Sequence, residues 1–393
     1  MPGDLREAAA GARRLLIIRL SSIGDVVHAL PVSAAFGETF PHLSISWIVE
    51  EMSAEIVTGN PFVRDVIVIP RSRWKSGRFR SPRVWVEYAA FLKRLRSSRF
   101  DITIDLQGYG KSGLMALATG APCRVGWWRL KEGAQIVSRA IPKARSSVHR
   151  VEWFLDCAAA LGADTSCPRF PLHIPDTATL RARQLLQEAG IDSDQRFVVL
   201  NCATGSAARR WGAIHYAQLA AGFADGFGLR SVLVGSAKDK KVNSRVAALA
   251  ETMLVGRCAA MRPLDLAGQT SLKELAAVLQ ASSLHIGGDT GSMHIAAALG
   301  TPVVGIYGPT DPAHAGPWGQ LDRVLERRTL CANECGVRRC VRTTDAQLVS
   351  RVGVVEEPAS PRAHDEPTAV CLAAIPASEV LRKAGEVLYA TER

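Results

Sequence analysis

The sequence lacks any apolar run that reaches the roughly 18 residues a membrane-spanning helix needs. It also lacks the pattern of a secretory signal peptide, because its N-terminal apolar run, Leu15–Ile18, is bracketed by Arg13, Arg14 and Arg19. We therefore expect a cytoplasmic protein. Zinc-finger spacing and the aromatic pattern of RNA-recognition modules are missing too, so nucleic acid is the weaker choice of partner.

Two nucleotide-binding signatures are also missing, the Walker P-loop and the G-x-G-x-x-G fingerprint. One pair of acids, Asp192 and Asp194, matches the D-x-D spacing that some transferases use for a metal. It follows Gly190 and precedes an expected strand, which favours a turn. We therefore predict no catalytic metal and no required cofactor.

The pattern that is present alternates short apolar, β-branched runs with stretches of helical periodicity. Such alternation predicts parallel sheets with right-handed crossovers, and 393 residues predict two domains. We expect strands at 15–20, 44–49, 66–69, 102–106, 197–201, 231–234, 284–286 and 303–307. Helices are expected at 84–95, 179–189, 214–223, 272–279 and 377–389.

The expected fold class is thus α/β, with two Rossmann-like, doubly wound parallel-sheet domains that face a central cleft. The proline-rich segment 163–177 is the expected connector. The predicted divisions are an acceptor-binding domain at 1–170 and a nucleotide-sugar-binding domain at 171–340. A surface insertion at 341–370, without periodicity, and a helical tail at 371–393 complete the plan.

The charge of +11 is unevenly distributed. Residues 1–175 hold 24 Lys and Arg against 15 Asp and Glu, whereas the remainder holds 24 against 22. The excess is densest from Arg71 to Arg99, where ten basic residues meet one acid, Glu87. This run is either a solvated surface or a face for phosphates, in an anionic membrane or a phosphorylated substrate.

Polar turns follow several of the expected strands, where open α/β sheets bind ligands. The first turn, Arg19–Asp25, places Asp25 in the first turn of a helix. The helix dipole alone would favour an acid there. A carboxylate beside Arg19 could also accept a proton from an attacking hydroxyl, as a general base does.

The second turn, Gly287–His294, combines a strand end, glycines and a helix start, which together form a ready anion site. A third, Asn201–Trp211, carries Arg209 and Arg210, either of which could clamp a phosphate. A fourth ends in Asp239, an acid that could hold ribose hydroxyls.

These turns, in their order along the chain, resemble those of glycosyltransferase family 9, the ADP-heptose:lipopolysaccharide heptosyltransferases. The resemblance covers roughly residues 14–330, and its most specific block runs from Gly288 to Pro312. It implies a GT-B fold and a metal-independent, inverting transfer of heptose from ADP-heptose to the lipopolysaccharide inner core. It also implies an enzyme peripheral to the cytoplasmic side of the inner membrane, acting on a phosphorylated, lipid-linked oligosaccharide.

The resemblance assigns roles to individual residues. Asp25 matches the catalytic base. Arg209 stands where the family usually has lysine. The nucleotide-sugar contacts that it implies are Thr204, Gly205, Arg209, Asp239, Asp289, Thr290, Gly291 and His294. The acceptor-binding area that it implies contains Arg19, Ser22, Arg73, Lys75, Gln107 and Lys111.

Three other readings of the sequence stay open. One is a protein heptosyltransferase of the autotransporter-modifying type, and another is a nucleotide-sugar epimerase on the same fold. The third is a degenerate fold that only binds anionic membrane, against which the intact Asp, Thr, Gly and His set argues.

Four cysteines near the C-terminus form a separate candidate, a structural site for zinc or iron. Three lie within ten residues, at Cys331, Cys335 and Cys340, and the fourth is Cys371. Four thiolates would suit a tetrahedral metal with no open position. Free buried thiols are the competing interpretation, and a cytoplasmic setting disfavours disulfides.

Overall fold

The computed structural model describes residues 5–76, 81–206, 209–256, 261–331 and 369–390. The chain divides into two compact units, Met1–His173 and Ile174–Arg393. The division falls inside the proline-rich segment expected to be a connector. None of the helices in the described ranges combines the length and the apolar character that a membrane span requires.

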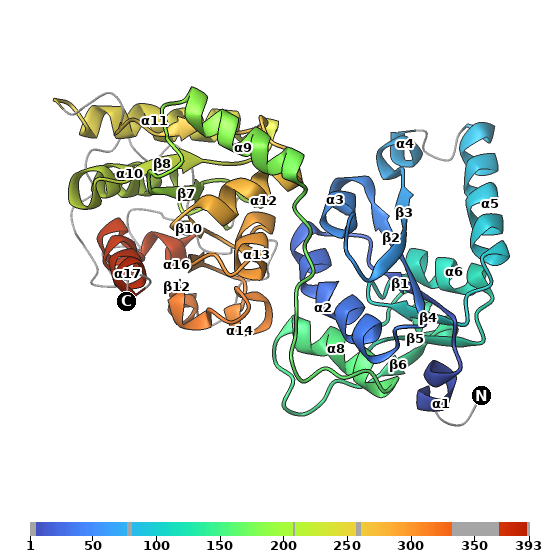
Figure 1. Ribbon diagram of the computed structural model, residues 1–393. Helices are drawn as coiled ribbons and strands as arrows, with labels where there is room; N and C mark the ends of the chain where they lie inside the picture. Colours follow the sequence, from blue (N-terminus) through green and yellow to red (C-terminus); the bar gives the residue numbers. More distant parts are fainter. Residues whose placement is uncertain (1–4, 77–80, 207–208, 257–260, 332–368, 391–393) are drawn as a thin grey trace. The chain divides into compact units, whose positions relative to one another are not determined.

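The first unit is built on a six-stranded sheet in the order β3-β2-β1-β4-β5-β6, with parallel pairing throughout (Figure 1). Its order reverses between β1 and β4, the switch point at which doubly wound sheets bind ligands. The strands are β1 (Arg14–Ile18), β2 (Ser44–Glu50), β3 (Val63–Ile69), β4 (Ile102–Asp105), β5 (Cys123–Trp127) and β6 (Arg139–Ile141).

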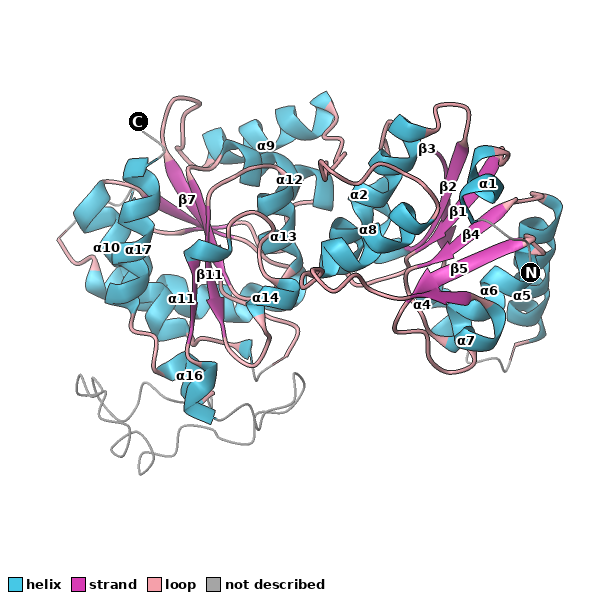
Figure 2. Cartoon of the chain, turned by 90° about the horizontal axis from the view of Figure 1, so that it is seen from below, coloured by secondary structure: helices cyan, strands magenta, loops and turns pink. Residues whose placement is uncertain are grey.

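Helices cover both faces of this sheet, which explains why the central strands carry consecutive buried residues, apolar throughout Leu15–Ile18 of β1. Figure 2 shows α2 and α8 on one face and α5, α6 and α7 on the other. The helices are α1 (Leu5–Ala10), α2 (Ile23–Thr39), α3 (Ala54–Val57), α4 (Arg71–Ser76), α5 (Pro82–Ser97), α6 (Gly110–Thr119), α7 (Ala134–Val137) and α8 (Arg150–Ala160).

The second unit repeats this plan with the order β12-β11-β10-β7-β8-β9. Counted within the unit, this is the same strand order as in the first, so its switch point lies between β7 and β10. The strands are β7 (Phe197–Asn201), β8 (Arg230–Leu233), β9 (Leu264–Asp265), β10 (Leu284–Gly287), β11 (Val303–Tyr307) and β12 (Val324–Glu326).

Helices again lie on both faces, with α9, α12 and α13 opposite α10 and α17 (Figure 2). Their bounds are α9 (Asp176–Glu188), α10 (Ala213–Phe227), α11 (Lys240–Met253), α12 (Leu272–Ala281), α13 (Gly291–Ala298), α14 (Pro312–Ala315), α16 (Val370–Ala373) and α17 (Ala377–Ala390). Short 3₁₀ turns occur at Glu51–Ser53, Ala237–Asp239, Leu321–Arg323 and Arg328–Cys331.

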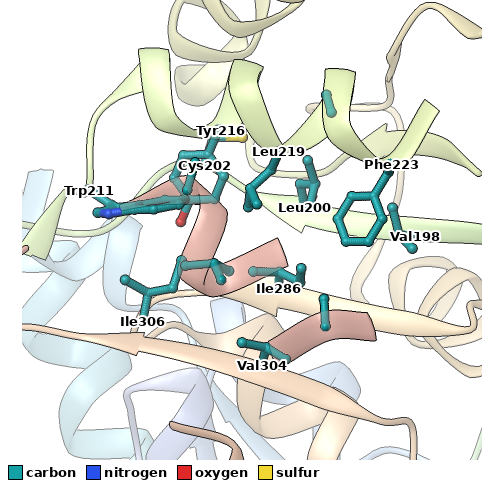
Figure 3. Close-up of a cluster of buried hydrophobic side chains, with 14 of the residues drawn as sticks. Val198, Leu200, Cys202, Trp211, Tyr216, Leu219, Phe223, Ile286, Val304 and Ile306 are labelled. Carbon is teal, nitrogen blue, oxygen red and sulfur yellow. The ribbon is translucent and has the colours of Figure 1, made fainter. Parts of the chain in front are cut away.

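The core of the second unit lies between α10, α17 and the sheet. Figure 3 shows Trp211, Tyr216 and Phe223 directed toward Ile286 and Ile306 of β10 and β11. Residues 371–393, set apart above as a helical tail, contribute α17 to this core. The Trp211 indole donates to the Ile375 carbonyl (2.9 Å), which ties the loop before α10 to the C-terminal segment.

The predicted α/β architecture of two Rossmann-like parallel sheets is confirmed. Every predicted strand is present, with ends that shift by up to three residues. The candidate metal site is described only in part, because Cys335 and Cys340 lie outside the described residues. Cys371 is buried. The site stays a prediction.

Candidate active site

Asp25 lies at the switch point of the first sheet, in the first turn of α2 after β1. Both the backbone N–H and the hydroxyl of Ser22 donate to Asp25 Oδ2, at 3.3 and 3.1 Å. A carboxylate at this position is stabilised by the helix dipole. Capping of α2 and exposure to a ligand are therefore compatible roles for Asp25, whose side chain is 17% exposed.

Two arginines hold the Asp25 carboxylate. Arg19 Nη2 lies 2.5 Å from Oδ2, and Arg150, the first residue of α8, pairs with Oδ1. Burial alone would raise the pKa of Asp25, but the charges of Arg19 and Arg150 and the Ser22 hydrogen bonds hold that pKa well below its usual range. Arg150 is more exposed than Arg19, at 28% against 5% for the side chains.

Arg19 and Gln107, both expected in the acceptor area, are mostly occupied by the protein itself. Arg19 Nη1 donates to the Leu106 carbonyl (2.5 Å). Gln107 Oε1 accepts from the backbone N–H groups of Leu20 and Ser21, at 3.0 and 3.3 Å. These bonds join the ends of β1 and β4, so the two residues form the framework that positions Asp25.

Asp105 completes that framework from the end of β4. It is fully buried and accepts from the N–H of Gly108 (2.8 Å) and the hydroxyl of Ser112 (2.8 Å). Burial raises the pKa of Asp105 to about 6. Gly108 has a φ of +78°, and a Cβ there would stand 2.4 Å from the Trp127 indole nitrogen, so this turn requires glycine.

Glu50, at the end of β2, gathers two basic side chains beside the same edge of the sheet. It is buried and pairs with Arg71 (2.6 Å) and with Lys111 (2.8 Å). Burial would raise the pKa of Glu50, but these two partners lower it. Lys111 was expected in the acceptor area, whereas Glu50 was not singled out from the sequence.

The basic segment that begins at Arg71 is only partly described. Arg73 is exposed and pairs with Glu87 of α5. Lys75 follows in α4, and residues 77–80 lie outside the described ranges. The role of this segment in acceptor binding stays a prediction.

At the switch point of the second sheet, Asp289 organises the turn between β10 and α13. Its Oδ1 lies 3.2 Å from His294 Nε2, and its Oδ2 accepts from Arg209 (2.7 Å) and Thr310 (3.0 Å). Burial would raise the pKa of Asp289, but its contacts with His294, Arg209 and Thr310 lower that pKa to about 2. Arg209 and His294 are thus brought together by one carboxylate.

A second network links the end of β7 to the same turn. Asn201 Nδ2 donates to Ser292 Oγ (2.7 Å) and lies 3.4 Å from Thr290 Oγ1. Ser292 Oγ also lies 3.2 Å from Nε2 of the fully buried His285. These contacts fix Thr290, the N-cap of α13, so that Thr290 and Gly291 stand at a helix N-terminus suited to anions.

The remaining nucleotide candidates lie near this turn or one strand away. Thr204 and Gly205 are in the loop after β7, where a Cβ on Gly288 would stand 3.4 Å from Thr204 Cγ2 and one on Gly205 would stand 3.6 Å from Arg209 Nη2. Asp239 follows β8, where its Oδ2 accepts from the N–H and the hydroxyl of Ser236, both at 2.7 Å.

The fold thus gathers most of the predicted residues at two switch points, one in each unit, while Arg73 and Lys75 lie on α4 and Asp239 follows β8. Sequence reasoning missed Glu50, Arg150, Asn201, His285, Ser292 and Thr310. Three of these, Asn201, Ser292 and Thr310, stand inside the motifs given above and could have been found there, whereas no motif pointed to Arg150. Among the described residues, no three His, Cys, Asp or Glu side chains are grouped as a metal site would need.

A family model, glycosyltransferase family 9 (heptosyltransferase), matches residues 88–343. This chain belongs to that family. It is therefore a glycosyltransferase of the heptosyltransferase family. Its two polar switch points lie in the fold of that family. The resemblance deduced from the turns is confirmed, including the block from Gly288 to Pro312.

Relatives of the transferase cover most of its length. Lipopolysaccharide heptosyltransferase 1 of Escherichia coli K12 is 29% identical over 79% of this chain and 92% of its own. Lipopolysaccharide core heptosyltransferase OpsX of Haemophilus influenzae is 25% identical over 80% of this chain and 84% of its own. The solved structure of E. coli heptosyltransferase WaaC with ADP is 28% identical, has a TM-score of 0.63, and is matched over 79% of this chain and 92% of its own.

Proposed function

We propose that this transferase moves heptose from ADP-heptose to a sugar of the lipopolysaccharide inner core, with inversion at the anomeric carbon. The observation that carries the proposal is the pair of switch points. The first presents a carboxylate, Asp25, and the second presents an anion-binding turn with Arg209 and His294. The relatives named for lipopolysaccharide heptosyl transfer support this choice of substrates.

The donor would bind to the second unit. The N-terminus of α13 offers the partial positive charge of a helix end, and Arg209 adds a full one. We propose that Thr290, Gly291, His294 and Arg209 contact the diphosphate and that Asp239 contacts the ribose. Thr204, Gly205 and Asp289 would complete the nucleotide site. The ADP bound in the related WaaC structure supports a nucleotide diphosphate as the ligand.

The acceptor would bind to the first unit. Asp25 would take the proton of the acceptor hydroxyl while its oxygen forms a bond to the anomeric carbon and the bond to the ADP oxygen breaks. Attack from the face opposite ADP inverts that carbon. Positive charge from Arg209 and α13 would stabilise the departing diphosphate, so this proposal needs no catalytic metal. Activity that persists in EDTA is the expected result.

Arg19 and Arg150 would act on Asp25 through its pKa. In the free protein they stabilise its charged form and make it a weak base. A negative group on the acceptor would draw the more exposed Arg150 away and leave Asp25 a stronger base. An acceptor sugar with a negative group close to its reacting hydroxyl would therefore suit this site.

The direct test is incubation of the purified protein with ADP-heptose and a series of truncated lipopolysaccharides, with the products read by mass spectrometry. One added heptose on an inner-core acceptor is the expected result. Turnover of ADP-heptose to an isomer, with no added mass on any acceptor, would instead indicate an epimerase. The proposed location at the cytoplasmic side of the inner membrane follows from this acceptor.

Arg209→Ala and His294→Ala should each weaken ADP binding by about 1.5–3 kcal/mol, because a charge-assisted or polar contact to phosphate is lost. Isothermal titration calorimetry with ADP would measure this. Arg183→Ala, at an exposed position of α9, is the control, since it removes the same charge from the same unit outside the second switch point, and its dissociation constant should stay near that of the wild type. Unchanged ADP affinity in both test variants would remove these residues from the nucleotide site.

Arg73→Glu combined with Lys75→Glu should raise KM for the acceptor several-fold and leave KM for ADP-heptose unchanged. The reason is loss of attraction for acceptor phosphates, which salt should also weaken. Arg181→Glu with Arg183→Glu, on the exposed side of α9 in the second unit, is the charge-matched control. Acceptor kinetics that ignore both the substitutions and the salt would leave this segment a solvated surface.

A further inference from the structure

Helix α5 of the first unit exposes an apolar side. Trp85 and Val86 are 50% and 68% exposed, and Ala89 and Ala90, one turn later, are exposed too. Spacings of one, four and five residues put these four on one side of the helix, here called the α5 face. A helix on the surface of a globular protein normally shows polar residues to water, so this face calls for an explanation.

The α5 face is held in place by the other side of the helix. Val84 and Leu95 are buried in the unit. Trp74 of α4 packs edge-on against Tyr88 and Phe91, with ring centroids 5.2 and 5.6 Å apart. Since its inner side already packs into the unit, α5 would have to detach from the unit before its outer side could be buried there.

The neighbouring helix α6 extends the exposed apolar surface. Leu114 and Leu117 are 43% and 51% exposed, and α6 packs beside α5 (Figures 1 and 2). Isolated exposed apolar residues are ordinary, but several on adjacent helices mark an interaction surface.

Cations border the α5 face at both ends of the helix. Arg83 lies in its first turn, and Lys93 and Arg94 lie near its end, all three exposed. The one acid between Arg71 and Arg99, Glu87, pairs with Arg73. An apolar stripe with Trp among basic residues fits a surface that is apolar inside and anionic outside, which is the make-up of a bilayer with acidic lipids.

We propose that α5 lies in the headgroup layer of an anionic bilayer, with Trp85 and Val86 inserted toward the acyl chains and Lys93 and Arg94 at the lipid phosphates. Tryptophan favours this depth because its ring is apolar and its N–H is polar. A second copy of the chain is a poorer occupant, since two such faces would oppose like charges. The proposal rests on the proposed function only in that the acceptor is a lipid-linked sugar.

Binding to vesicles of phosphatidylglycerol and phosphatidylcholine in equal parts tests this, with vesicles of phosphatidylcholine alone for comparison. The wild type should bind the anionic vesicles more tightly. Trp85→Ser with Val86→Ser should weaken binding about ten- to a hundredfold at every salt concentration, since two apolar side chains no longer enter lipid. Lys93→Glu with Arg94→Glu should weaken it by about fivefold or more per cation at low salt, and less at high salt.

Matched controls are Leu180→Ser and Val255→Ser, which remove exposed apolar side chains from the second unit and should leave binding unchanged. Brominated lipids should quench tryptophan fluorescence in the wild type, and Trp85→Phe should abolish most of that quenching. Vesicle binding that survives Trp85→Ser with Val86→Ser, or a wild-type dimer that this change dissociates, would overturn the proposal.

Transfer to a delipidated inner-core oligosaccharide separates this proposal from the proposed function. Trp85→Ser with Val86→Ser should retain wild-type turnover of that water-soluble acceptor while losing vesicle binding. If neither the wild type nor the variant transfers heptose to the delipidated oligosaccharide, the proposed function is wrong. The vesicle measurements would still test whether the α5 face binds lipid.

Discussion

Asp25→Asn should lower kcat for heptosyl transfer by about 10²–10⁴-fold while ADP binding stays nearly unchanged. The amide keeps the shape of the carboxylate but cannot accept a proton from the acceptor hydroxyl, and loss of a general base has this typical cost. ADP binding should survive because Asp25 and the nucleotide residues belong to different units. Rates from single turnovers, with ADP titrated by calorimetry, would measure both.

One result would argue against this role for Asp25, and another would make the measured rate uninformative. Near-normal turnover in Asp25→Asn would remove the base assignment. Loss of folding would make a low rate uninformative, because Asp25 also receives the Ser22 hydrogen bonds at the start of α2. Circular dichroism of Asp25→Asn should still show the wild-type fold, because asparagine Oδ1 can accept from Ser22. Its melting temperature should fall, because Arg19 and Arg150 lose their carboxylate partner.

A companion variant, Arg150→Met, tests the base through its pKa. Removing this charge should raise the pKa of Asp25, because one of the two cations that stabilise the carboxylate is lost. The acidic limb of kcat/KM reports the essential base of the free enzyme. That limb should move to higher pH in Arg150→Met, and Arg145→Met, an exposed arginine just before α8, should not move it.

The Asp25 site shows which contacts sequence patterns can predict and which they cannot. The turn after β1 could be predicted, because a buried apolar strand followed by small residues and an acid has a local meaning. Arg150 could not be, since it meets Asp25 only when α8 packs against α2, 125 positions along the chain. Neither periodicity nor motif spacing carries information about that contact.

The missed strands have a similar physical cause. β9 has two residues and β12 and β6 have three each, too short for any alternation to be visible. All three are edge strands of their sheets. The fourth missed strand, β5, has only one β-branched residue, Val125. Their positions are set by pairing with a longer neighbour rather than by their own side chains.

The C-terminal segment shows the same effect on a larger scale. Helical periodicity predicted α17, but not its place. The placement comes from Leu381 against Gly222 of α10 and from Gly385 against Phe227, where a Cβ on either glycine would stand 2.6–3.1 Å from the neighbouring side chain. Close approach of two helices at glycines depends on both sequences at once.

The stability of the chain should fall on acidification, and the titration of His285 should account for a distinct part of that fall. His285 is fully buried at the second switch point beside Ser292, and burial lowers its pKa from 6.5 to about 3. Between pH 6.5 and about pH 3, His285 is protonated in the unfolded chain and neutral in the folded chain. The free energy of unfolding is then nearly constant well above pH 6.5 and falls by about 1.4 kcal/mol per pH unit well below it, so that the loss is on the order of 4 kcal/mol by pH 3.

Urea unfolding at several pH values between 6.5 and 4.5 would measure this, with wild type and His285→Gln compared. Glutamine can still hydrogen-bond to Ser292 but does not titrate, so the free energy of unfolding of His285→Gln should fall by roughly 2 kcal/mol less than that of the wild type across this range. Other titrating groups are common to both proteins and cancel in the difference. His42→Gln, at an exposed position of the first unit, should keep the wild-type slope. Parallel slopes for wild type and His285→Gln would mean that the folded protein accepts a proton on His285, and with it a charge directly behind the turn that would hold the diphosphate.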